Sequence, residues 1–110
     1  MNNEEISIEQ AAQLLDQQGS LFTEIFKHGS LVVEFYKPDK IDLQQPHDRD
    51  EIYVIASGSG TFFKEGTRRE FKSGDFIFVA AGAEHRFEDF TSDFATWVFF
   101  YGPVGGEGNS

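Results

Sequence analysis

Apolar residues near the start of the chain follow the period of an α-helix. They are Ile8, Ala11, Ala12, Leu14 and Leu15, which recur at spacings of three and four. Ser7 and Gln10 have the spacing of a capping box, and Gly19 can adopt the left-handed conformation that ends a helix. We therefore predict an amphipathic helix over residues 8–18, lying on the outside of the main body.

From Leu21 onward the apolar positions alternate, as they do in β-strands. The predicted strands span residues 21–27, 31–37, 41–46, 61–64, 67–71, 76–79, 85–90 and 94–101, and one more carries His47 and Glu51 and ends at Gly58. Short strands separated by turn-forming residues are typical of an all-β sandwich or barrel. The sequence therefore predicts an all-β fold with one short N-terminal helix.

Some predicted strands are apolar on both faces. In residues 76–79, Phe76 and Phe78 face away from Ile77 and Val79. One face can fill the interior of the fold, and the other needs a cover, which the helix, a second sheet or another subunit can provide. We expect a homodimer on this basis.

Length and composition limit the domain organisation and the compartment. A chain of 110 residues is long enough for one domain, which we place at residues 6–104 between a disordered start (1–5) and a flexible glycine-rich tail (105–110). The chain has no cysteine, which excludes disulfides, thiolate zinc sites and a cysteine nucleophile. It has neither a signal-peptide pattern nor a long apolar run, so we expect a cytoplasmic protein that does not enter a membrane.

The net charge argues against one class of partner. With 19 acidic and nine basic residues, the formal net charge is −10. An acidic surface repels phosphate backbones, so we expect no nucleic-acid binding.

The residues that suggest chemistry are two histidines, a glutamate and a glutamine. Gln45, His47 and Glu51 are all odd-numbered, so on one extended strand they would project to the same face. His85 follows Glu51 by 34 residues, after a second run punctuated by glycines. Two imidazoles and a carboxylate suit a divalent metal ion, with Gln45 as a candidate fourth ligand. A buried Glu51 requires a cation or hydrogen-bonding partners, because an unpaired buried carboxylate is costly.

The spacing of these residues resembles the two motifs of the cupin superfamily. The first motif is Gly-x5-His-x-His-x3,4-Glu-x6-Gly, in which His47, Glu51 and Gly58 fall in register, while Gln45 replaces the first histidine and the leading glycine is missing. The second is Gly-x5-Pro-x-Gly-x2-His-x3-Asn. Gly74, Gly82 and His85 match it, with Ala80 and Asp89 at the proline and asparagine positions. The resemblance implies a small, single-domain jelly-roll barrel or sandwich.

The resemblance also implies a bound divalent transition metal. Metal-binding cupins hold their ion with the positions that His47, Glu51 and His85 occupy here. Gln45 departs from the family pattern, and its amide oxygen is a weaker, harder ligand than an imidazole. We therefore expect iron, manganese or zinc, with nickel also acceptable, and Gln45 either binds the metal directly or bonds to a metal-bound water or a substrate.

A substrate pocket is expected beside the metal. Tyr53 and Phe87 keep the parity of Glu51 and His85, and Trp97 and Phe99 are also candidates to line it. Arg49 can pair with a substrate carboxylate, or else with a neighbouring aspartate at the surface.

Three functions are compatible with this sequence. The first is a metal-dependent enzyme on a small organic molecule, of the dioxygenase or the isomerase or lyase type, in which Glu51 could act as a base if it is not a ligand. The second is a non-enzymatic module that binds a small molecule with weak or no metal, and the third is a cupin that has lost its function. No residue identifies the substrate or the reaction, so other catalytic residues stay unknown.

Overall fold

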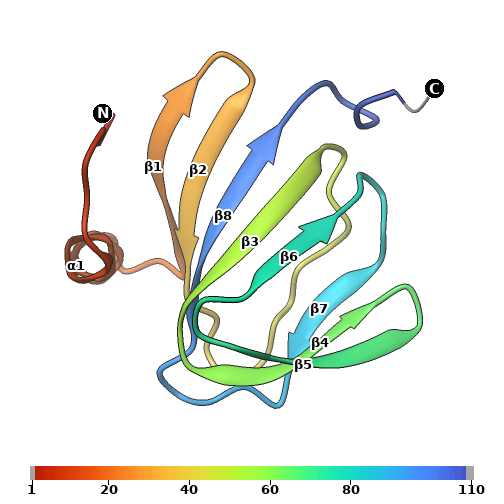
Figure 1. Ribbon diagram of the computed structural model, residues 1–110. Helices are drawn as coiled ribbons and strands as arrows, with labels where there is room; N and C mark the ends of the chain where they lie inside the picture. The colour runs from red at the N-terminus through yellow and green to blue at the C-terminus, as the bar shows by residue number, and fades with distance from the viewer. Residues whose placement is uncertain (1, 109–110) are drawn as a thin grey trace.

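The computed structural model describes residues 2–108, which form one helix and eight strands (Figure 1). The elements in chain order are α1 (Ile8–Gln18), β1 (Phe22–His28), β2 (Leu31–Tyr36), β3 (Asp50–Ser57), β4 (Ser59–Lys64), β5 (Thr67–Lys72), β6 (Phe76–Val79), β7 (His85–Glu88) and β8 (Ala95–Tyr101). The predicted helix is confirmed with its capping box between Ser7 and Gln10 and its left-handed Gly19. Within residues 2–108, no helix is both long and apolar enough to cross a membrane.

The strands form two antiparallel sheets. The larger has the order β1-β2-β8-β3-β6, and the smaller has the order β5-β4-β7. Chain neighbours are separated in the larger sheet, because β8 lies between β2 and β3 (Figure 1). The predicted all-β sandwich with one helix is therefore confirmed.

The inner faces of the two sheets meet in an aromatic core. Its buried residues are Tyr53, Ile55, Phe62, Phe71, Val79, Ala83, Phe87, Phe94 and Val98. The rings of Phe87 and Tyr53 meet edge to face at 4.8 Å between centroids, and Phe87 lies 4.6 Å from Phe94. Offset and edge contacts of this kind are the favourable ones between aromatic rings.

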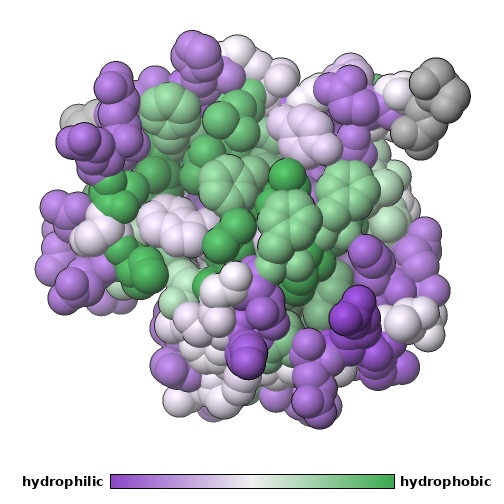
Figure 2. All heavy atoms as spheres, in the orientation of Figure 1, coloured by the Kyte–Doolittle hydropathy of each residue, from purple (hydrophilic) through white to green (hydrophobic). Residues whose placement is uncertain are grey.

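The outer face of the larger sheet is apolar too. The helix α1 covers its β1 and β2 end, where Ala11 and Leu15 pack with Val33 and Phe35. Beyond the helix, an apolar surface extends over β8, β3 and β6 (Figure 2). It includes the exposed side chains of Phe76 and Phe78. The expected two-faced apolar strands are therefore present, and the helix covers only part of the outer face.

Gly58 marks the corner at which the chain passes from one sheet to the other. It has φ of 81°, and a Cβ there would lie 2.6 Å from the Cα of Phe94. Only glycine combines an easily adopted positive φ with the absence of a Cβ that would clash with Phe94. The hydroxyl of Ser57 donates to the carbonyl of Asp93 on the same opposing loop.

Two predicted strands need correction. Residues 41–46 form no strand, apart from an isolated bridge between Asp39 and Ile41. The segment is held by the Asp42 carboxylate, which accepts hydrogen bonds from the Tyr36 hydroxyl and the Phe87 N–H, in place of a backbone ladder. The strand expected over 85–90 ends at Glu88, since Asp89 has a positive φ of 49°.

The ends of the chain contact the main body. The Asn2 and Asn3 side chains bond to the backbone of β1, and the Glu107 N–H donates to Asp50. The disorder expected over 1–5 and the flexibility expected over 105–110 stay predictions, and residues 1 and 109–110 lie outside the described part.

Candidate metal centre

Glu51 lies at the entry of β3 into the core. In register it stands between Phe100 of β8 and Val79 of β6, and its side chain is fully buried. Among residues 2–108, neither carboxylate oxygen has a hydrogen-bond partner. A carboxylate buried in this way costs several kcal/mol unless a positive charge or a proton compensates it. Glu51 therefore needs either a cation close by or a proton of its own.

His85 provides the nearest donor atom. It begins β7, and its Nδ1 lies 2.8 Å from the carbonyl oxygen of Ala83. Because a carbonyl can only accept, Nδ1 carries the hydrogen, and a neutral ring then presents the lone pair of Nε2. Nε2 lies 2.9 Å from Glu51 Oε1, yet without the direction of a hydrogen bond. Burial lowers the pKa of His85, but Glu51 and the Ala83 carbonyl outweigh it and raise the pKa above its usual value.

His47 completes the cluster from the loop before β3. Its Nε2 lies 3.8 Å from Glu51 Oε1 and 3.2 Å from the side-chain oxygen of Gln44. The His47 ring lies 5.5 Å from the His85 ring, and it packs edge to face on Phe100. The two motifs are also joined through the backbone, because the Gly82 N–H donates to the His47 carbonyl at 2.7 Å.

The three side chains fit a divalent metal ion. One donor atom from each of His47, Glu51 and His85 can be chosen so that all lie within 4.8 Å of one another. Ligands about 2.1 Å from an ion at right angles are about 3 Å apart, which is close to the Glu51–His85 separation. Two imidazoles and one carboxylate are the donor set of many zinc and non-haem iron sites. The unpartnered atoms of Glu51 and His85 are those that an ion would satisfy.

The structure brings Gln44, rather than Gln45, to this cluster. Gln45 is exposed, and within the described residues its side chain makes no hydrogen bond to His47, Glu51 or His85. Strand alternation does not place Gln45 on the same face as Glu51, because β3 begins only at Asp50. Gln44 instead accepts the Tyr53 hydroxyl at 3.0 Å with its side-chain oxygen.

A buried carboxylate that sequence reasoning missed orients Gln44. Asp42 is only 6% exposed, and its Oδ2 accepts the Gln44 side-chain N–H at 2.8 Å. Because a carboxylate only accepts, this contact turns the amide oxygen of Gln44 toward His47. No pattern distinguishes Asp42 in the sequence, since it lies in an irregular loop.

An open hollow of about 590 Å³, here called the histidine hollow, reaches the cluster at His47. It is lined by Ser20, Leu21, Phe22, Glu34, Tyr36, Ile41, Leu43, Gln44, His47, Val98 and Phe100. These residues include no lysine or arginine. Burial, together with the charges of Glu24 and Glu51, raises the pKa of Glu34 from 4.5 to about 6. Burial and the Asp42 carboxylate raise the pKa of Tyr36, so its phenol keeps its proton.

Three of the predicted pocket residues lie elsewhere. Trp97 and Phe99 belong to the outer cluster, and Trp97 packs edge to face on Phe35 at 4.8 Å. The inward residues of β8 are Val98 and Phe100, so Trp97 and Phe99 lie on its outward face. Arg49 donates to the carbonyls of Gly102 and Ser30, does not line the hollow, and forms no ion pair with a carboxylate among residues 2–108.

The other two predicted pocket residues are interior. Tyr53 and Phe87 are buried in the core beside the cluster, with Tyr53 6.1 Å from the His85 ring between centroids. Neither lines the histidine hollow. They pack in the core beside the cluster and do not form the pocket wall.

Comparisons with known sequences identify the fold family. Residues 32–101 match the profile of the Cupin domain (Cupin_2), which is more than half of the chain and includes His47, Glu51 and His85. The uncharacterized protein SCO3923 of Streptomyces coelicolor is 31% identical over 62 residues. That alignment spans 56% of this chain and 59% of the Streptomyces protein.

Solved structures agree with this match at low sequence identity. KdgF from a Halomonas species has a TM-score of 0.64 at 19% identity, over 74% of this chain and 78% of its own. A cupin protein from Bacteroides fragilis has a TM-score of 0.61 at 20% identity, over 81% of this chain and 82% of its own. Likeness at this identity shows the fold and leaves function open. The profile match and the shared architecture show that the chain belongs to the cupin family.

Proposed function

We propose that this cupin is a metal-dependent enzyme that acts on a small organic molecule. The observation that carries the proposal is the set of buried donor atoms on Glu51 and His85 that no hydrogen bond within residues 2–108 satisfies. His47, Glu51 and His85 would hold one ion of iron, manganese or zinc, with nickel as a further candidate. A bound ion would supply a Lewis acid, or a redox centre if it were iron.

The residues around the cluster have separate tasks in this proposal. The Ala83 carbonyl fixes the tautomer of His85, and Gln44 positions His47 while it accepts the Tyr53 hydroxyl. The apolar walls of the histidine hollow hold the body of the substrate and exclude water. Glu34, with a pKa of about 6, can take up or release a proton near neutral pH, which suits isomerase or lyase chemistry. Dioxygenase chemistry would instead depend on the redox activity of the ion.

The histidine hollow also favours one kind of substrate. Its lining carries a carboxylate and no cation, so a neutral or basic molecule with an apolar body suits it better than an anion.

A second candidate function is a binding module that needs no metal. It is favoured by the 2.9 Å separation of Glu51 and His85, because a protonated His85 could neutralise the buried carboxylate. The histidine hollow would then bind a small molecule without turnover.

Elemental analysis of untagged protein, purified without chelator, distinguishes these candidates. We expect about one equivalent of iron, manganese or zinc in the wild type and a large loss in His47→Ala and His85→Ala. His28→Ala is the matched control, since His28 is exposed at the end of β1. Wild-type protein that binds no divalent ion at all, even when ions are added back, would favour the binding module.

We further propose that the uncovered outer face mediates a homodimer. The apolar surface over β8, β3 and β6 supports this assembly (Figure 2), because a second copy would cover apolar side chains such as those of Phe76 and Phe78. Sedimentation of Phe76→Asp should show a weaker dimer than the wild type, whereas Leu43→Asp at the rim of the histidine hollow should not. A wild-type monomer at micromolar concentration contradicts the proposal.

A further inference from the structure

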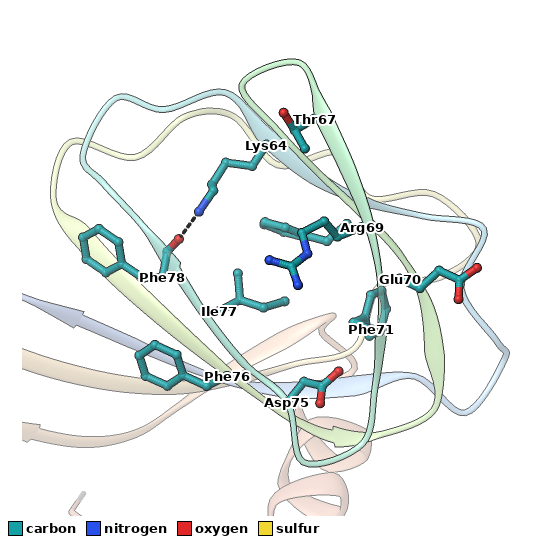
Figure 3. A pocket seen from close by; sticks show the side chains of 10 residues that line it. Lys64, Thr67, Arg69, Glu70, Phe71, Asp75, Phe76, Ile77 and Phe78 are labelled. Carbon is teal, nitrogen blue, oxygen red and sulfur yellow. Dashed lines mark hydrogen bonds between the residues drawn. The ribbon is translucent and has the colours of Figure 1, made fainter.

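A second hollow of about 450 Å³ opens between β5 and β6, and we call it the arginine hollow (Figure 3). The strand β6 ends the larger sheet opposite β1, and β5 ends the smaller sheet. No residue that lines it also lines the histidine hollow. The arginine hollow is therefore a separate feature, and nothing in the proposed metal chemistry uses it.

The strand register directs Arg69 into this hollow. Arg69 is paired with Phe62, whose side chain is buried in the core, so both lie on the inner face of the smaller sheet. Figure 3 shows the guanidinium in the middle of the hollow, beside Ile77. Arg68, one residue earlier, faces the opposite side.

Arg69 is unusual among the arginines of this sheet. Arg68 and Arg86 both pair with Glu88, at 2.8 Å and 2.7 Å, and both lie over the ring of Phe63. Among residues 2–108, Arg69 forms no ion pair and no side-chain hydrogen bond. Its five N–H donors are therefore available to a ligand.

Two cations and two carboxylates line the hollow, and the Arg69 guanidinium is the charged group at its centre (Figure 3). The Lys64 ammonium donates to the Phe78 carbonyl at 2.7 Å, which places a second cation on the wall. Asp75, which accepts the Lys72 N–H, and Glu70 both line the hollow, and the Glu70 carboxylate points away from Arg69 (Figure 3). A positive centre on a chain with net charge −10 is a local exception.

Apart from Thr67, the rest of the lining is apolar. Phe62 and Phe71 are each 5% exposed, and with Ile77 they present hydrophobic surface beside the guanidinium. We propose that the arginine hollow binds a small molecule that has a carboxylate on a flat apolar body. The carboxylate pairs with Arg69 through two parallel N–H bonds, which lysine cannot reproduce, and the flat body lies on the apolar wall.

Titration with benzoate tests this proposal by amide chemical shifts of full-length protein. At low salt we expect saturable shifts centred on β5 and β6 with a millimolar Kd. Benzamide, which has the same shape without the charge, should bind more weakly. Arg69→Gln should weaken benzoate binding about tenfold, and Arg69→Lys should restore it only in part.

Arg68→Gln is the matched control, since it removes the same charge from the neighbouring position on the opposite face. Its affinity for benzoate should stay within about twofold of the wild type. Equal affinity in Arg69→Gln and the wild type would overturn the proposal, as would shifts centred on His47 and His85 that His85→Ala abolishes. The metal content of Arg69→Gln should equal that of the wild type, so the two proposals can fail separately.

Discussion

The two hollows of this protein lie at opposite ends of the same sheet and differ in charge. The histidine hollow is formed on the β1, β2 and β8 side, and its charged group is the carboxylate of Glu34. The arginine hollow is formed beside β6, and Arg69 stands at its centre. One hollow therefore presents a carboxylate and the other an arginine, on either side of β3.

The difference between the hollows follows from which inward positions are polar. Along β3, the inward residues change from Glu51 to Tyr53 and Ile55, so polar chemistry is confined to one end. The aromatic core then separates the two hollows. Phe62 belongs to this partition, since its ring lies 6.2 Å from the His85 ring and it also lines the arginine hollow.

Truncating Phe62, which lies between the two hollows, should have the largest effect on the free energy of unfolding. We expect Phe62→Ala to lower the free energy of unfolding by about 3–5 kcal/mol, because it deletes a buried ring that contacts Tyr53 and Phe87. Phe22→Ala, at a side chain that is 52% exposed, should change it by only about 0.5 kcal/mol. Urea denaturation with comparable m-values measures both. Equal losses in the two variants would show that Phe62 is not part of the stabilising core.

Local patterns predicted the helix and most of the fold. The helix bounds followed from Ser7, Gln10 and Gly19, which act through neighbouring backbone groups and need no tertiary information. The grouping of His47, Glu51 and His85 followed from motif spacing, because the family resemblance carried the long-range information that periodicity lacks.

The remaining errors have a common physical origin. On β8 both faces are apolar, so alternation alone could not tell Trp97 and Phe99 from Val98 and Phe100. Gln45 was placed by extending strand parity into a loop, where side-chain bonds such as those of Asp42 decide the conformation. Arg69 was missed because its importance lies in the absence of a partner, which only the three-dimensional arrangement reveals.

A divalent ion should act on one hollow only. If the wild type binds it, an ion at about 100 times its Kd raises the free energy of unfolding by about 2.7 kcal/mol, because it binds the native state alone. We expect this gain to disappear in His85→Ala and to persist in Arg69→Gln. Thermal unfolding with added zinc or manganese, compared with chelator, measures it. Loss of the gain in Arg69→Gln would show that the two hollows are coupled.

The smallest predicted effect concerns the carboxylate of the histidine hollow. The native state holds the proton of Glu34 to about pH 6, whereas an ordinary glutamate releases it near 4.5. The native state therefore binds more protons between these values, and the stability linked to the protonated form is present below pH 4.5 and is lost as the pH rises through 6. With partial exposure taken into account, wild-type protein should lose about 1 kcal/mol more than Glu34→Gln over this interval. Denaturation in chelator at several pH values measures the difference. The control is Glu70→Gln, which makes an equal charge change beside the arginine hollow and should follow the wild-type curve. Parallel curves for Glu34→Gln and the wild type would contradict the prediction, because they would show that Glu34 titrates as if it were in water.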